Sequence, residues 1–333
     1  MKKFEEAEQK LREMLASGKF ARGDRFPSEY QLADELGINR ATVSKAVAAL
    51  IADGLLQRAD RSRRGTMVSM EEKHAWKHLL FLVTNLYIYE TEVYKGFQAA
   101  AFAAGYLPTL LNPHIDDLES VVANIPQGKF AGICTNIVWR SFQIPCVYFG
   151  RNDFNQGNRT EWGVSPDTYQ GGRLIASRLA EMGKTDFIYI LPYNRSYTRL
   201  KRVRGFMDRM RELGVPEPEK RTYLDMGGNP HSKREMLKQQ KKKFSSINAI
   251  ISTNDFLTQE FYKAARELKW DLGSIAFAGF GNIREVKCSM PIITVDEHNF
   301  DVGRTAFEKL HRIIQGETRN EPREEILPVE LIV

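Results

Sequence analysis

The chain has 333 residues, a length that favours two or three domains over one small one. Apolar residues make up 42% and charged residues 27%, which excludes wholesale disorder and fibrous repeats. No stretch approaches the roughly 18 to 20 apolar residues that cross a bilayer, the N-terminus has no apolar signal core, and three cysteines cannot form a disulfide framework. We therefore expect a cytoplasmic protein without a membrane partner.

Positive charge is concentrated near the N-terminus. Residues 1–69 carry 13 Lys and Arg against 10 Asp and Glu, so half of the net charge of +6 lies in a fifth of the chain. The segment from Gln57 to Thr66 holds four arginines and one aspartate. A basic loop is also typical of a solvated turn, so its meaning depends on the elements that precede it.

The first 53 residues predict three helices. Apolar residues at three- and four-residue steps predict an amphipathic helix over 3–16. Ser28 opens a second helix through an S-x-x-Q capping box, and Gly37 ends it. Asn39 then caps a third helix over 40–53. Two helices joined by a tight glycine-containing turn are the helix-turn-helix pattern.

Polar residues gather in the first turns of the third helix, where a recognition helix presents donors to base edges and phosphates. They are Arg40, Thr42, Ser44 and Lys45. Two short strands, 55–58 and 66–68, then flank the arginine-rich turn and predict a wing. A helical oligomerisation module is the alternative, but it leaves the caps, the tight turn and the basic wing unrelated to one another.

The run from Gly23 to Glu29, the run from Leu36 to Arg40, and Gly65-Thr66-Met67-Val68 closely resemble the GntR-family winged helix-turn-helix over residues 3–69. The resemblance implies that this domain binds operator DNA. The implied DNA-binding residues are Arg25, Ser28, Glu29, Asn39, Arg40, Thr42, Ser44, Lys45, Arg63, Arg64, Gly65 and Thr66. Many members carry an arginine where this chain has Ser44, so the half-site sequence cannot be carried over from relatives.

From His78 onward, strand-like and helical segments alternate. Expected strands are 79–83, 107–111, 132–134, 146–149, 187–191, 249–251, 275–278 and 292–295, and expected helices are 92–105, 168–182, 199–213, 255–268 and 300–315. This alternation predicts an α/β fold with doubly wound parallel sheets covered by helices on both faces. Ligands in such folds bind at the carboxyl ends of the strands.

This region lacks the motifs of catalysis. It contains no P-loop lysine motif, no G-x-G-x-x-G after a strand and no H-E-x-x-H. The six histidines are scattered without the spacing of metal ligands. We therefore expect no catalytic residues, no metal and no cofactor.

Several short motifs follow one another in the order typical of the LacI/GalR repressors. Lys95-Gly96-Phe97, the run from Asp167 to Gly172, the run from Arg202 to Phe206, and Thr253-Asn254-Asp255 resemble the ligand-binding region of that family over residues 78–333. The resemblance implies a two-lobed fold shared with periplasmic sugar-binding proteins. A GntR head on a LacI-type body is the architecture of arabinose-type repressors.

The resemblance makes eight positions candidates for effector contact: Asn85, Tyr94, Trp139, Arg151, Tyr197, Thr198, Arg202 and Asn254. Arg202 offers five donors to hydroxyls or a carboxylate, and the aromatic rings could stack on a sugar. The alternatives are an ion pair across the lobe for Arg202 and core packing for the aromatics. Gly281 stands where relatives carry Asp and supplies no carboxylate opposite Arg202, which favours a sugar acid over a neutral sugar. The segment 136–143 allows only two helical turns, fewer than relatives have.

We therefore predict a DNA-binding domain over 1–69, a linker over 70–77 and an effector-binding and dimerisation domain over 78–333. The leading hypothesis is a homodimeric repressor whose operator affinity is controlled by a sugar or sugar acid bound between the lobes. One alternative is a regulator fused to an enzymatic, pyridoxal-phosphate-binding domain, but the chain lacks the length and the lysine motif. Another is a solute-binding protein without a transcriptional role, which the DNA-binding head opposes.

Overall fold

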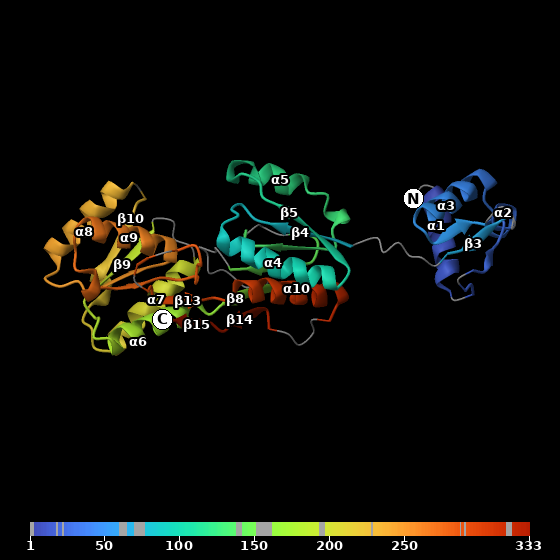
Figure 1. Cartoon of the computed structure of the whole chain (residues 1–333). Coiled ribbons are helices and arrows are strands. Elements are labelled where there is room, and N and C mark those ends of the chain that lie inside the picture. Colours follow the sequence, from blue (N-terminus) through green and yellow to red (C-terminus); the bar gives the residue numbers. More distant parts are fainter. Residues whose placement is uncertain are drawn as a thin grey trace. The chain divides into compact units, whose positions relative to one another are not determined.

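The computed structural model divides into two compact units, Met1–Trp76 and Lys77–Val333, which we call the head and the body (Figure 1). It describes residues 3–17, 19–21, 23–59, 65–69, 77–137, 142–150, 162–192, 197–227, 229–286, 288–289, 291–317 and 322–333. Among these residues, no helix is long and apolar enough to cross a bilayer. All three cysteines are free thiols.

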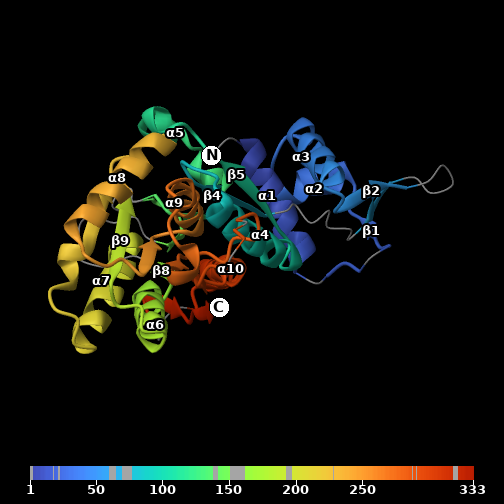
Figure 2. The same cartoon turned by 60° about the vertical axis from the view of Figure 1, so that its left-hand side comes forward.

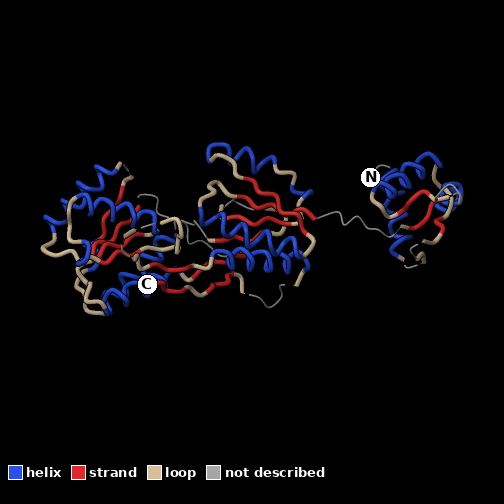
Figure 3. The backbone as a smooth tube through the Cα atoms, viewed as in Figure 1, coloured by secondary structure: helices blue, strands red, loops and turns tan. Residues whose placement is uncertain are grey.

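The head combines three helices with a small antiparallel sheet (Figure 3). Its elements are α1 (Lys3–Ala16), β1 (Arg25–Phe26), α2 (Glu29–Leu36), α3 (Arg40–Ala52), β2 (Leu56–Arg58) and β3 (Thr66–Val68), and the strands pair in the order β1-β3-β2. Leu11, Leu32 and Val47 bring the three helices into one apolar core. Phe26 and Val68 join that core from the sheet. This arrangement confirms the predicted winged helix-turn-helix.

Short-range hydrogen bonds fix the turn between α2 and α3. The N–H of Gln31 donates to Ser28 Oγ (3.3 Å), and the N–H of Ser28 donates to Gln31 Oε1 (2.9 Å), which completes the predicted capping box. Gly37 ends α2 with a φ of 64°, a left-handed conformation that glycine adopts readily. Asn39 Oδ1 accepts from the N–H of Ala41 (2.8 Å) where α3 begins. The predicted caps are therefore confirmed.

The body contains two parallel sheets, each the centre of one lobe. The first lobe has a six-stranded parallel sheet in the order β14-β8-β7-β6-β4-β5. Its strands are β4 (Lys77–Leu82), β5 (Tyr106–Leu111), β6 (Gly132–Thr135), β7 (Cys146–Phe149), β8 (Trp162–Pro166) and β14 (Glu324–Leu327). The helices α4 (Ile88–Ala103) and α10 (Asn299–Gln315) pack on one face, and α5 (Leu118–Asn124) packs on the other.

The second lobe has a four-stranded parallel sheet in the order β10-β9-β11-β12. Its strands are β9 (Phe187–Pro192), β10 (Thr222–Asp225), β11 (Ala249–Ser252) and β12 (Ala276–Ala278). The helices α6 (Thr168–Glu181) and α7 (Tyr197–Glu212) cover one face, and α8 (Pro230–Lys243) and α9 (Asp255–Glu267) cover the other (Figure 2). The chain passes between the lobes at 166–168, 296–299 and 327–330, which we call the crossover segments.

The predicted elements of the body appear with small shifts, and some elements are additional. The helix expected over 92–105 begins four residues earlier, at Ile88. Elements outside the expected set are α5, α8, β8, β10, β14 and β15 (Glu330–Ile332). The short strands β13 (Thr294–Asp296) and β15 pair antiparallel, an exception to the expected parallel pairing. The expected two-turn segment over 136–143 falls partly outside the described residues.

Close-packed glycines join two helices in each lobe. In the second lobe, a Cβ on Gly205 of α7 would lie 1.9 Å from the carbonyl oxygen of Tyr169 on α6. In the first lobe, a Cβ on Gly96 of α4 would lie 1.9 Å from the carbonyl oxygen of Phe300 on α10. A contact this short leaves no room for a side chain, so the two backbones touch. The same packing in both lobes fits a fold built from two similar halves.

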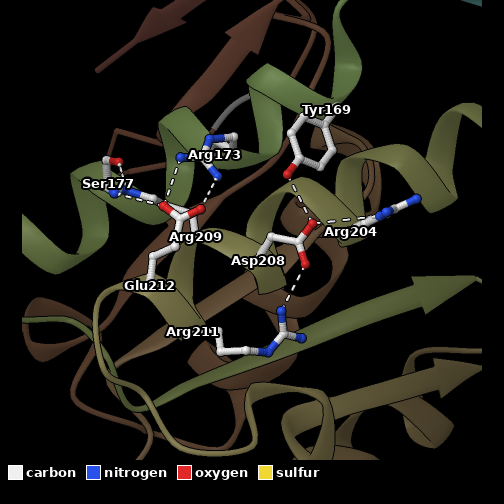
Figure 4. Close-up of polar contacts among 8 residues, drawn as sticks. All are labelled: Tyr169, Arg173, Ser177, Arg204, Asp208, Arg209, Arg211 and Glu212. Carbon is white, nitrogen blue, oxygen red and sulfur yellow. Dashed lines mark hydrogen bonds and ion pairs between the residues drawn. The ribbon is translucent and has the colours of Figure 1, made fainter.

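Charged pairs reinforce the contact between α6 and α7 (Figure 4). Arg173 donates to both carboxylate oxygens of Glu212 (2.7 and 2.8 Å), and the hydroxyl of Tyr169 donates to Asp208 Oδ2 (3.0 Å). Hydrogen bonds from Arg173 and then from Arg209 lower the pKa of Glu212 to about 2. A shallow depression beside these residues is therefore lined by charges that already pair with one another.

Candidate DNA-binding surface and interlobe polar cluster

The N-terminal half of α3 carries the polar side chains that the sequence assigns to DNA binding. Arg40 and Lys45 are exposed, and Asn39 is exposed where the helix begins. Thr42 and Ser44 are half-buried. In a helix-turn-helix, these first turns of the second helix enter the major groove and contact base edges. The structure therefore keeps the predicted residues of α3 together at the end of the helix that would meet DNA.

The wing brings two further predicted residues together. Arg25 on β1 is exposed, and a Cβ on Gly65 would lie 3.1 Å from Arg25 Nε. Thr66 is only 8% exposed, and its predicted contact with DNA stays a prediction. Arg63 and Arg64 lie outside the described residues, so their predicted role stays a prediction.

Two arginines of the head converge on one carboxylate. Glu29, in the first turn of α2, lies 3.9 Å from Arg40 Nε and 3.4 Å from Arg58 Nη2. The guanidinium of Arg40 also lies 4.0 Å from the centre of the Tyr30 ring and donates to the Tyr30 hydroxyl (2.7 Å). Sequence reasoning missed Tyr30 and Arg58. Tyr30 could have been noticed in the sequence, because it is an aromatic residue among polar ones in the first turn of a capped helix.

In the body, Arg202 is buried and its guanidinium is bonded to protein groups. Its Nε donates to Glu297 Oε1 (2.9 Å), its Nη2 donates to both Glu297 oxygens, and its Nη1 donates to the carbonyl oxygen of Thr253 (2.7 Å). Arg202 is 8% exposed and Glu297 is 1% exposed. This contact is the ion pair that the sequence left open as the alternative to a ligand contact.

The origin of this carboxylate corrects one premise of the sequence analysis. Gly281 supplies no acid, but Glu297 supplies one from the crossover segment 296–299, 95 residues away from Arg202 along the chain. The Arg202 guanidinium therefore already faces a negative charge. Because Arg202 is compensated within the protein, it gives no preference for an acidic effector.

Six of the buried polar atoms that lack a hydrogen-bond partner among the described residues lie after a strand or in the first turn of the next helix, except for one within β9. They are Tyr89 Oη, Glu90 Oε2, Asn136 Oδ1, Tyr189 Oη, Thr253 Oγ1 and Asn299 Oδ1. Asn136 directly follows β6 and Thr253 directly follows β11, so both lie at carboxyl ends of strands. Because buried polar groups are nearly always hydrogen-bonded, this concentration indicates a place where a bound polar molecule or water completes the bonding.

Electrostatic coupling connects these atoms across the lobes. Burial, and then the charges of Glu297 and Glu90, raise the pKa of the Tyr89 hydroxyl far above its usual range. Burial raises the pKa of the Glu90 carboxyl. Tyr89 and Glu90 belong to the first lobe, whereas Arg202 and Thr253 belong to the second lobe. We call the residues that carry the six unpartnered atoms, together with Arg202 and Glu297, the interlobe polar cluster.

The remaining predicted effector residues take different positions. Asn85 is exposed after β4, and Thr198 is half-buried in the first turn of α7. Asn254 caps α9 through its side-chain oxygen. Tyr94 packs edge-on against Phe81 with ring centroids 5.1 Å apart, which is the core-packing alternative. The described structure does not include Trp139, Arg151 and the side chain of Tyr197.

The chemistry available in the interlobe polar cluster is that of binding. Its hydroxyl, amide and carboxyl groups can exchange hydrogen bonds with a polar ligand. In the parts of the chain that the structure describes, no group of three or more His, Cys, Asp or Glu side chains could hold a metal ion.

Two protein families match separate parts of the chain. Residues 3–68 match the family described as bacterial regulatory proteins, gntR family. Residues 176–333 match the periplasmic binding protein-like domain. The first match covers the head, and the second covers the second lobe from the middle of α6 onward together with the C-terminal elements of the first lobe.

Solved structures resemble the chain in fold. A transcription regulator GntR from Chromobacterium violaceum is 20% identical, with a TM-score of 0.65, over 77% of this chain and 98% of that one. A complex of the transcriptional regulator CelR with cellobiose is 16% identical, with a TM-score of 0.67, over 92% and 99%. A periplasmic binding protein/LacI transcriptional regulator from Alkaliphilus metalliredigens, complexed with D-xylulofuranose, is 21% identical, with a TM-score of 0.62, over 77% and 97%.

Proposed function

The head of this chain belongs to the gntR family of bacterial regulatory proteins and its body contains a periplasmic binding protein-like domain, and from this premise we propose a ligand-responsive repressor of transcription. The head binds operator DNA, and the body binds a small carbohydrate effector at the interlobe polar cluster. The protein acts in the cytoplasm as a homodimer, because a single winged head makes few phosphate contacts and a twofold pair on a palindrome doubles them. It has no catalytic role, in keeping with the regulators that it resembles.

The observation that carries this proposal is the set of unpartnered buried polar atoms in the interlobe polar cluster. Leaving one such group unsatisfied costs about 1–3 kcal/mol, so a ligand that bonds to several of them gains binding energy. Tyr89, Tyr189 and Thr253 offer hydroxyls, which both donate and accept. A compound with many hydroxyl groups matches this set.

The charge of the cluster favours a neutral effector. Arg202 and Glu297 neutralise each other, and the Glu90 carboxyl interacts with the Arg199 guanidinium, so two acids face two arginines and no net positive charge is left to attract an acid. We therefore replace the preference for a sugar acid with a neutral sugar. The solved complexes with cellobiose and with D-xylulofuranose support this class, since both ligands are neutral sugars bound by structurally similar proteins.

The position of Glu297 suggests how effector binding in the body changes the affinity of the heads for operator DNA. Glu297 lies in a crossover segment between the lobes, beside His298, whose φ of 49° places it in the left-handed region. A ligand that bonds to the cluster changes the contacts around this segment and so biases the angle between the lobes. In a dimer that angle sets the spacing of the two heads, which couples effector binding to operator affinity.

A thermal-shift screen of the full-length protein tests the effector class. The screen contains neutral sugars, including ribose and cellobiose, and the corresponding sugar acids. A neutral sugar at 100 times its Kd should stabilise the body by about 2.7 kcal/mol. A larger stabilisation by an acid than by every neutral sugar would refute the neutral-sugar proposal, and the absence of stabilisation by any compound would count against effector binding.

A further inference from the structure

Four side chains of the head form a cluster that links α2, α3 and the wing. Glu29 contacts Arg40 of α3 and Arg58 of β2, while Arg40 also stacks on Tyr30 and donates to its hydroxyl. Glu29 contributes the only carboxylate among the four, and its side chain is 17% exposed. Tyr30, by contrast, is 67% exposed, and the side chains of Arg40 and Arg58 are 53% and 62% exposed.

This difference in exposure separates the role of Glu29 from the role of the three exposed side chains. A carboxylate that faced DNA would repel the phosphates, but Glu29 is the most buried of the four and points its oxygens at the two arginines. It thereby accepts a hydrogen bond from Arg58 and attracts Arg40 electrostatically before DNA arrives. Arg40 and Arg58 retain donors that Glu29 does not use, because a guanidinium has five N–H groups.

Tyr30 is placed to work with Arg40. Its ring lies against the guanidinium, which keeps the Arg40 group oriented, and its hydroxyl oxygen accepts from Arg40 Nη1. The hydroxyl proton of a tyrosine that accepts in this way can still be donated to a phosphate oxygen. Arg58, at the end of β2 where the wing begins, places a second positive charge on the same cluster.

We propose that Tyr30 and Arg58 contact DNA, and that Glu29 is a positioning residue that gives Arg40 its sequence specificity. This proposal rests on the proposed DNA-binding function and assigns residues that the family resemblance did not. It also revises the expectation that Glu29 itself contacts DNA. Glu29 instead restrains the arginines, and it weakens binding to any duplex by its negative charge.

The test measures the affinity of the full-length protein for two DNA samples by fluorescence anisotropy. One sample is a duplex enriched from a random pool on the wild-type protein, and the other is the unselected pool. Glu29→Gln should bind the unselected pool more tightly and the enriched duplex less tightly, so that the ratio of the two affinities falls by about fivefold or more. Glu181→Gln, at an exposed glutamate of α6, is the matched control and should leave the ratio unchanged.

Salt dependence separates the other two roles. Arg58→Ala should reduce the slope of log affinity against log salt by about 1, as loss of one phosphate contact does. Tyr30→Ala should lower affinity for the enriched duplex several-fold without changing that slope, and Tyr30→Phe should recover the part that depends on stacking. Arg204→Ala, at an exposed arginine of the second lobe, controls for a general loss of charge.

Three results would overturn the assignment. A parallel loss of both affinities in Glu29→Gln, with a lowered melting temperature of the head, would mean that Glu29 only supports the fold. Unchanged binding in Tyr30→Ala, or an unchanged salt slope in Arg58→Ala, would remove that residue from the DNA contacts. If the wild-type protein enriches no sequence from the pool, the proposed DNA-binding function is wrong. This outcome is seen without any variant, so it can be told apart from the results that concern single residues.

Discussion

Removing Arg202 should destabilise the body even when no effector is present. Arg202→Ala leaves the carboxylate of Glu297 buried without its partner, since Glu297 is 1% exposed and receives three hydrogen bonds from this guanidinium. It also removes the donor to the carbonyl oxygen of Thr253 and the cation that lies 4.8 Å from the Phe280 ring. Breaking a buried ion pair in this way costs about 3–5 kcal/mol.

Thermal unfolding of the full-length protein measures this cost. For a domain of about 150–250 residues, 1 kcal/mol lowers the Tm by roughly 2–4 °C, so the transition of the body should fall by about 6–20 °C. Arg304→Ala is the control, because Arg304 pairs with Asp301 and Glu308 on the exposed side of α10 and such pairs contribute less than about 1 kcal/mol.

A double variant isolates the pair itself. Arg202→Met combined with Glu297→Leu removes both charges and keeps an apolar volume, so it should recover most of the stability that Arg202→Ala loses. The opposite pattern would refute the reasoning: a normal melting temperature in Arg202→Ala, together with the loss of stabilisation by a sugar. That result would mean that Arg202 bonds to the effector and that the contact with Glu297 contributes little.

Three further predictions concern packing, pH and capping. Gly205→Ala should lower the melting temperature of the body, because its Cβ would overlap the carbonyl oxygen of Tyr169. The control is Gly183→Ala, at an exposed turn with open space, which should lower the melting temperature only through the strain of its left-handed backbone. Burial raises the pKa of Asp255 to about 6, so the folded body holds a proton that the unfolded chain has lost above about pH 4. The stabilisation this gives is present at low pH and is lost as the pH rises through 6; Asp255→Asn should remove that component of the pH dependence in urea titrations. Ser28→Ala should destabilise the head by about 1 kcal/mol in the same titrations, and a value near zero would mean that the capping box contributes nothing.

The head was predictable because its determinants are local. The capping box of Ser28, the left-handed Gly37 and the cap at Asn39 each act within four residues along the chain. Apolar spacing alone then places Leu32 and Val47 in the core. Local patterns could not assign Thr66 to the interior, since its burial depends on the pairing of β3 with both β1 and β2.

The body was less predictable because its key contacts join distant segments. The strand β14 enters the first sheet beside β8 about 160 residues later in the chain, after α10 and before the return to the second lobe, and neither short strand has a distinctive pattern. Glu297 reaches Arg202 across 95 residues, so no motif spacing could identify it as the partner. The match of Arg202 to a family motif indicated a ligand contact, and only the fold reveals the competing carboxylate.

The central claim is that one chain joins DNA binding in the head to ligand binding in the body. Its most direct test is the affinity of the full-length protein for the duplex enriched on it, measured with and without the neutral sugar that stabilises it most. The account predicts a change of about 5- to 150-fold, the range of a typical coupling between two sites. A sugar that stabilises the body but leaves the affinity for this duplex unchanged would contradict it.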